Sequence, residues 1–96
     1  MTETIEQLSF VSLDGRSLPH SRAEIVHEPW GWQVELYHVP ADRRPLVRQV
    51  GLIALTTLDD YRYAGTVIVD VVTEERGFML LSGIGQLRLL AAANAA

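Results

Sequence analysis

The clearest pattern in the chain is a strict alternation over residues 30–38, "WGWQVELYH". With period two, Trp30, Trp32, Val34, Leu36 and His38 fall on one side, and the residues between them fall on the other. Such alternation is typical of a β-strand with one buried face. A proline flanks the stretch at each end and cannot donate a ladder hydrogen bond. The pattern therefore predicts a strand that ends where these prolines stand.

Two more strands are predicted upstream of this one. Residues 22–28, "RAEIVHE", alternate in the same way. Residues 4–13, "TIEQLSFVSL", alternate more loosely, with Leu8 and Phe10 assigned to one face. Asp14-Gly15 then predicts a tight turn, because glycine tolerates a positive φ.

After Pro45 the pattern changes to nearly continuous apolar runs. These runs cover residues 46–58, 63–72 and 77–90. The glycines within the strands, Gly51, Gly65, Gly83 and Gly85, are typical of bulges or bends. A strand that is apolar on both faces is covered on both sides, by a second sheet, by barrel closure or by another subunit. We expect the last strand to end near Leu90, with residues 91–96 as a frayed tail or a short helical end.

The predicted fold has about six strands and, before the C-terminal end, no helix. The expectation is an all-β protein, either a single small antiparallel barrel or a compact sandwich, with residues 1–96 forming one domain. The 96 residues leave no room for a second core.

The apolar runs have two apolar faces, and one face of each fills the interior of a small barrel. The other face would leave a larger apolar patch than soluble monomers usually carry. We therefore expect a homo-oligomer, most simply a dimer, or docking on a protein partner. The residues assigned to that interface are Val67, Val69, Val71, Met79, Leu81 and Leu87.

Composition narrows the class of protein. The chain has no cysteine, which excludes a disulfide framework and a thiolate metal site. Its first twenty residues lack a basic start and an apolar run, and no apolar run reaches the ~18 residues that span a bilayer. We expect a cytoplasmic protein with no membrane contact. The net charge of -4 disfavours nucleic acid as a partner.

All eight basic residues are arginine, which fits the codon use of a GC-rich genome. The densest group is Arg43, Arg44 and Arg48, a candidate site for a nucleotide or another phosphate ligand. Arg44 and Arg48 form R-x-x-x-R, which resembles the opening of PilZ domains, small β-barrels that bind cyclic di-GMP. That family carries a D/N-x-S-x-x-G motif on a following strand, whereas "DYRYAG" at 60–65 has arginine in place of serine. The resemblance is confined to two residues and the β character.

Both tryptophans are assigned to the core, because Trp30 and Trp32 share a face with aliphatic residues. The alternative is a pair of aromatic rings on a surface that stacks against a carbohydrate or a base. That surface would need polar neighbours, and the neighbours on this face are aliphatic.

The sequence offers few candidate metal-binding or catalytic residues. His20, His27 and His38, with Glu28 or Glu35, match no known metal-ligand spacing, so no metal is expected, and His27 and His38 are assigned single hydrogen-bond partners. The sequence has no nucleophile elbow, zinc-protease motif or phosphate loop. Asp70 stands alone in an apolar run, and a solvent-facing position is preferred over a buried general acid.

Two classes of function follow from these observations. The leading hypothesis is a non-enzymatic interaction or assembly module that acts through its apolar C-terminal strands. The alternative is a small-ligand domain that uses the loop around Arg44. No cofactor and no catalytic residue are expected.

Overall fold

The computed structural model describes residues 4–92 and contains seven antiparallel strands and one short 3-10 helix. The strands are β1 (Thr4–Leu13), β2 (Arg16–Ser17), β3 (Arg22–Glu28), β4 (Gly31–Tyr37), β5 (Val50–Thr57), β6 (Tyr61–Thr73) and β7 (Phe78–Ala92), and the helix η1 is Ala41–Arg43. Within the described residues there is no helix long and apolar enough to cross a bilayer.

Six of the strands form a closed barrel. They follow the order β1-β3-β4-β7-β6-β5, and β5 pairs back onto β1 to close the ring. The two-residue β2 pairs only with the end of β1, through the predicted turn at Asp14 and Gly15, both of which have positive φ. The predicted all-β class and small antiparallel barrel are confirmed.

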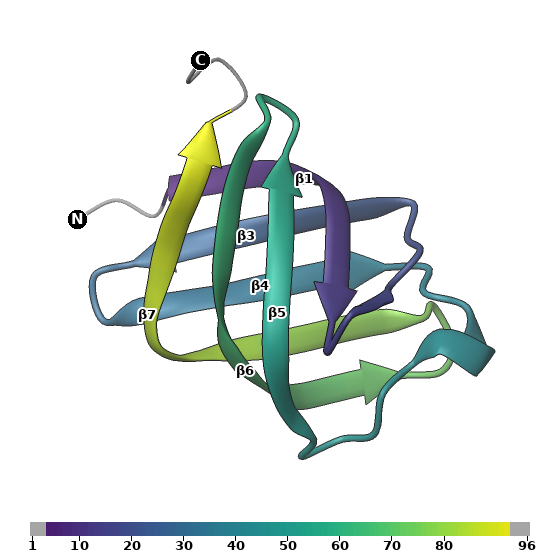
Figure 1. Cartoon of the computed structure of the whole chain (residues 1–96). Helices are drawn as coiled ribbons and strands as arrows, with labels where there is room; N and C mark the ends of the chain where they lie inside the picture. Colours follow the sequence, from purple (N-terminus) through teal and green to yellow (C-terminus); the bar gives the residue numbers. More distant parts are fainter. Residues whose placement is uncertain (1–3, 93–96) are drawn as a thin grey trace.

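The two longest strands of the barrel bend (Figure 1). β6 has 13 residues and β7 has 15. In Figure 1, the first part of β6 lies between β5 and the last part of β7, and the other parts of β6 and β7 run across behind. Their pairing shifts register three times, including at Gly65 and Asp70. Such bulges let one strand serve two layers of a barrel.

Trp32 is the largest side chain in the core and lies against two glycines. Its exposed fraction is 8%, and its indole occupies the space that a Cβ on Gly65 or Gly83 would need. Its Nε1 donates a hydrogen bond of 2.9 Å to the Gly85 carbonyl. The prediction that Trp32 is a core anchor is confirmed. The glycines of β6 and β7 thus make room for the indole as well as marking bends.

Trp30 does not belong to the core, and its assignment there was wrong. It lies in the turn between β3 and β4, one residue before β4 begins, and its exposed fraction is 77%. The alternating pattern runs into the turn by chance, because a turn residue does not follow the period of the strand.

Bulges also change which side chains of β1 and β6 face the core. In β1 the register shifts between Leu8 and Phe10, so Leu8 is buried with Val11 while Phe10 is exposed. In β6 the shift at Asp70 leaves Val71 exposed and turns Val72 towards the core. A bulge adds one residue to a strand, so the side chains after it exchange faces.

Most of the predicted interface residues lie inside the barrel, which corrects that assignment. Val67, Val69, Met79 and Leu81 are fully buried, and Leu87 is half-buried against the same core. The alternation separates the two faces of β6 and β7, but it does not show which apolar face is internal. The apolar residues on the outer side of these strands instead include Ile68, Val71, Leu80 and Ile84.

The last strand is longer than the sequence predicted. β7 continues to Ala92, two residues past the expected end near Leu90. The remainder of the predicted tail, residues 93–96, lies outside the described residues.

Candidate functional site

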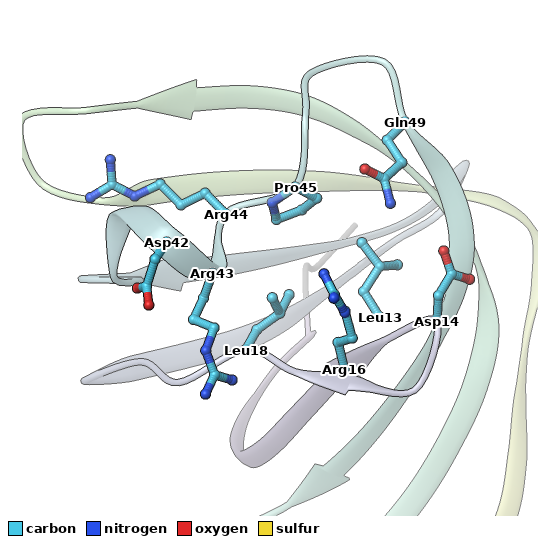
Figure 2. Close-up of a pocket in the computed structure, with 9 residues that line it drawn as sticks. All are labelled: Leu13, Asp14, Arg16, Leu18, Asp42, Arg43, Arg44, Pro45 and Gln49. Atoms are coloured by element: carbon cyan, nitrogen blue, oxygen red, sulfur yellow. The ribbon is translucent and has the colours of Figure 1, made fainter.

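A small pocket lies at one end of the barrel, beside the arginine-rich loop (Figure 2). It has a volume of about 110 Å³, and an adjoining hollow of about 260 Å³ shares part of its wall. The hairpin between β1 and β2 forms one side, and η1 with the chain that follows it forms the other. Its lining residues are Leu13, Asp14, Arg16, Leu18, Asp42, Arg43, Arg44, Pro45 and Gln49.

The three arginines predicted to bind a ligand do not converge there. Arg44 Nε donates a hydrogen bond of 2.8 Å to the Val39 carbonyl, and its guanidinium points away from the other lining side chains in Figure 2. Arg43 is exposed and donates a hydrogen bond of 3.4 Å to the Ser17 carbonyl. Arg48 does not line the pocket, and its backbone N–H donates to Val69. The R-x-x-x-R spacing therefore builds no shared binding point.

Arg16 joins the pocket instead, and the sequence analysis missed it. The β1–β2 hairpin folds Arg16 back towards η1, which lies more than twenty residues further along the chain. The turn at Asp14-Gly15 was the available signal, because it reverses the chain just before this arginine.

The charges around the pocket are mixed. Arg16 and Arg43 stand with Asp42 and Asp14, and Asp14 Oδ1 accepts a hydrogen bond of 2.8 Å from the Leu52 N–H. Pockets that enclose small molecules usually measure about 300–1,000 Å³. A pocket of this size and charge could hold a small anion at its rim but could not enclose a dinucleotide.

A second polar cluster joins β1, β3 and β6 near the other end of the barrel. The Glu6 carboxylate lies 2.7 Å from His27 Nε2 and accepts a 3.2 Å hydrogen bond from the Tyr63 hydroxyl. His27 therefore has the single partner expected for it. Burial raises the pKa of Tyr63 above its ordinary value of 10.0, and the neighbouring Glu6 carboxylate raises it further.

The raised pKa of Tyr63 predicts a loss of stability in alkali. The folded state holds the phenolic proton of Tyr63 more tightly than the unfolded state does, so the stabilisation that this proton gives is complete below about pH 10. This stabilisation is lost as the pH rises through the higher pKa that Tyr63 has in the folded state. Denaturant titrations from pH 8 to 11 should show a shallower decline for Tyr63→Phe than for the wild type. Equal slopes would mean that Tyr63 ionises as freely when folded as when unfolded.

The three histidines lie in separate places. His20 donates from Nδ1 to the Leu18 carbonyl at 2.8 Å, and His38 is exposed and hydrogen-bonded to the Ser21 hydroxyl. Within residues 4–92 no three His, Asp or Glu side chains are grouped as a metal would require. Asp70 is exposed and accepts a 2.7 Å hydrogen bond from Ser82, so its predicted solvent-facing position is confirmed.

The outer side of β5, β6 and β7 carries apolar residues beside polar ones such as Thr66 and Asp70. Val50 of β5 lies opposite Ile68 of β6 in the sheet. Leu52 of β5 lies opposite Thr66 of β6, and Thr66 lies opposite Ile84 of β7. Leu52 is the most open of these, with an exposed fraction of 68%. We call Val50, Leu52, Ile68 and Ile84 the outer patch. Contiguous apolar surface of this kind often marks an interaction site.

The last part of β7 is exposed along one side of its backbone. β6 pairs with β7 between Phe78 and Ala92, with register shifts that leave residues 85–87 and Leu90 without a partner in β6, whereas β4 pairs only with Met79–Ser82. Residues 86–92 thus have a single neighbouring strand among the residues that the structure describes. We call this segment the β7 edge. Two of its leucines are open to solvent, Leu89 at 57% and Leu90 at 58%.

Comparison with known protein families, curated proteins and solved structures finds no significant match to this chain.

Proposed function

We propose that this protein is a non-enzymatic assembly module that binds a second copy of itself through the exposed end of β7. The β7 edge is the single observation that carries the proposal. Within residues 4–92, it combines backbone groups without a second partner strand and exposed leucines on one segment. Both features are stabilised when another protein surface covers them.

The size of the chain supports self-association. A domain of 96 residues buries about 60–65% of the surface of its unfolded chain. Its stability is therefore limited, and a subunit contact adds to it by mass action. The outer patch lies beside the β7 edge, since Ile84 is in β7 itself, and gives the same side of the molecule further apolar area.

Light scattering after size-exclusion chromatography tests the proposal. The wild type should have at least twice the 10.7 kDa chain mass at micromolar concentration. Leu89→Lys should shift the mass to that of the monomer, because a charge placed on an edge strand opposes pairing with another strand. Leu46→Lys is the matched control, since Leu46 is 78% exposed but lies in the loop before β5, and this variant should remain a dimer. A wild type that stays at 10.7 kDa up to millimolar concentration would contradict the proposal.

A ligand-binding function has weaker support. Its supporting observation is the pair Arg16 and Arg43 at the rim of one pocket above the apolar Leu13 and Leu18. The small volume and the nearby carboxylates limit this site to a small anion. Inorganic phosphate should raise the melting temperature of the wild type more than that of Arg43→Ala if the site is used. The same shift in both proteins would exclude it.

A further inference from the structure

We propose that a second pocket, between the loop after η1 and the β6–β7 turn, binds a zwitterionic small molecule with an apolar side chain, an α-amino acid of the size of leucine. This pocket lies outside the β7 edge and the outer patch. The inference therefore goes beyond self-association and does not depend on it.

The first step is the size and lining of this pocket. It shares Arg44 and Pro45 with the pocket in Figure 2, and its other lining residues are different. Its volume is about 310 Å³, which lies within the range of about 300–1,000 Å³ that is usual for pockets that hold small molecules. Most of its lining is apolar and consists of Ala41, Pro45, Leu46, Val47 and Val72.

The second step is the apolar wall. Leu46 and Val47 have exposed fractions of 78% and 49%, and Val72 is half-buried against the core. The loop that carries Leu46 and Val47 is tied to β6, because the Arg48 N–H donates a hydrogen bond of 2.8 Å to the Val69 carbonyl. An apolar ligand side chain that covers this wall removes apolar surface from water, which is favourable.

The third step is the cationic group. Arg44 Nε donates a hydrogen bond of 2.8 Å to the Val39 carbonyl, and the Val39 N–H donates to the Gly77 carbonyl in the β6–β7 turn. Arg44 Nη2 lies against the same glycine, since a Cβ on Gly77 would be 3.1 Å from it. These contacts fix the guanidinium through its Nε side. Its two terminal nitrogens can then donate a pair of hydrogen bonds to a carboxylate.

The fourth step is the anionic group. Glu74 directly follows β6, is exposed, and lines the same pocket as Arg44. Among the residues that the structure describes, neither Arg44 nor Glu74 belongs to an ion pair. The Glu74 carboxylate opposes a ligand that is only an anion, and the Arg44 guanidinium opposes one that is only a cation. The pocket therefore favours a ligand that carries both charges beside an apolar group.

Titration of isotope-labelled protein with unlabelled L-leucine, followed by methyl NMR, tests the inference. Millimolar leucine is needed, because exposed charge pairs contribute little binding energy. The methyl signals of Val47 and Val72 should move and saturate, while those of Leu13 and Leu18 in the other pocket stay in place. Isocaproate lacks the ammonium group of leucine and isoamylamine lacks its carboxylate. Each should bind about tenfold more weakly, because it loses a hydrogen-bonded charge.

Two variants test the charged groups separately. Glu74→Gln should weaken leucine binding about tenfold without weakening isocaproate binding, because it removes only the partner of the ammonium group. Glu75→Gln is the matched control, since it makes the same change of charge in the same turn at a residue that does not line the pocket. Arg44→Gln should weaken the binding of leucine and of isocaproate alike.

Three results would overturn the inference. They are equal affinities for leucine and isocaproate, signal changes at Leu13 and Leu18 in place of Val47 and Val72, and the absence of any saturable change. Glu74 and Glu75 are both exposed, so their variants should fold like the wild type and keep the test decisive. None of these results bears on self-association, which the mass in solution tests independently.

Discussion

Replacing Trp32 with alanine is expected to lower the free energy of unfolding by about 3–5 kcal/mol, the usual range for deleting a buried aromatic side chain. The indole fills the space over Gly65 and Gly83, and neither glycine has a side chain that could refill it. The change also removes the hydrogen bond to Gly85. Native domains have a total stability of about 5–15 kcal/mol, so the variant should lose a large fraction of its stability.

Trp30→Ala is the matched control for this experiment. Trp30 is 77% exposed, and its removal should change the stability by no more than about 0.5 kcal/mol. Urea denaturation followed by circular dichroism measures both variants. In Trp30→Phe, the remaining Trp32 should emit at a blue-shifted wavelength and resist quenching by iodide. Similar losses of stability for Trp32→Ala and Trp30→Ala would contradict the assignment of the core.

Gly83→Ala is expected to destabilise the barrel by about 1–3 kcal/mol, because the added methyl group overpacks the core. A Cβ at this position would overlap the indole of Trp32, which is itself held between β6 and β7. The indole cannot move aside without losing its hydrogen bond to Gly85. Thermal unfolding should therefore show a clearly lower Tm for this single added carbon.

Gly31→Ala provides the comparison for Gly83→Ala. A Cβ on Gly31 would meet no atom within 4 Å, and the backbone there needs no positive φ. Its Tm should stay within a few degrees of the wild type. The double variant Gly83→Ala/Trp32→Phe should lose less stability than the sum of the two single losses, because the smaller phenylalanine ring leaves space for the added methyl group. Additive losses in that double variant would show that the indole is not what Gly83 accommodates.

The alternation in β4 predicted its strand and its buried face because one side of β4 packs inside and the other does not. Trp32, Val34 and Leu36 are all buried as predicted. The apolar runs of β5, β6 and β7 carried less information. Both faces of these strands are apolar, so period two separated the faces but left the internal one undetermined, and Val69 and Leu81 were assigned outward.

Non-local contacts explain the rest of what the sequence could not show. The extra residue at the β6 bulge reverses the pattern after Asp70, and a bulge is set by the bend of the barrel rather than by one residue type. The pocket at the end of the barrel depends on a hairpin that brings Arg16 to η1. The β7 edge follows from where β4 stops, a length that no pattern within β7 reveals.

Hydrogen exchange at two protein concentrations tests the central claim most directly. The amides of residues 86–92 that point away from β6 should exchange rapidly in dilute monomer and slow markedly at concentrations where the mass doubles. The amides of β5 are the internal reference, because β1 and β6 already pair with that strand and its exchange should not change. If residues 86–92 exchange equally fast in the monomer and in the associated protein, then β7 does not form the contact between copies.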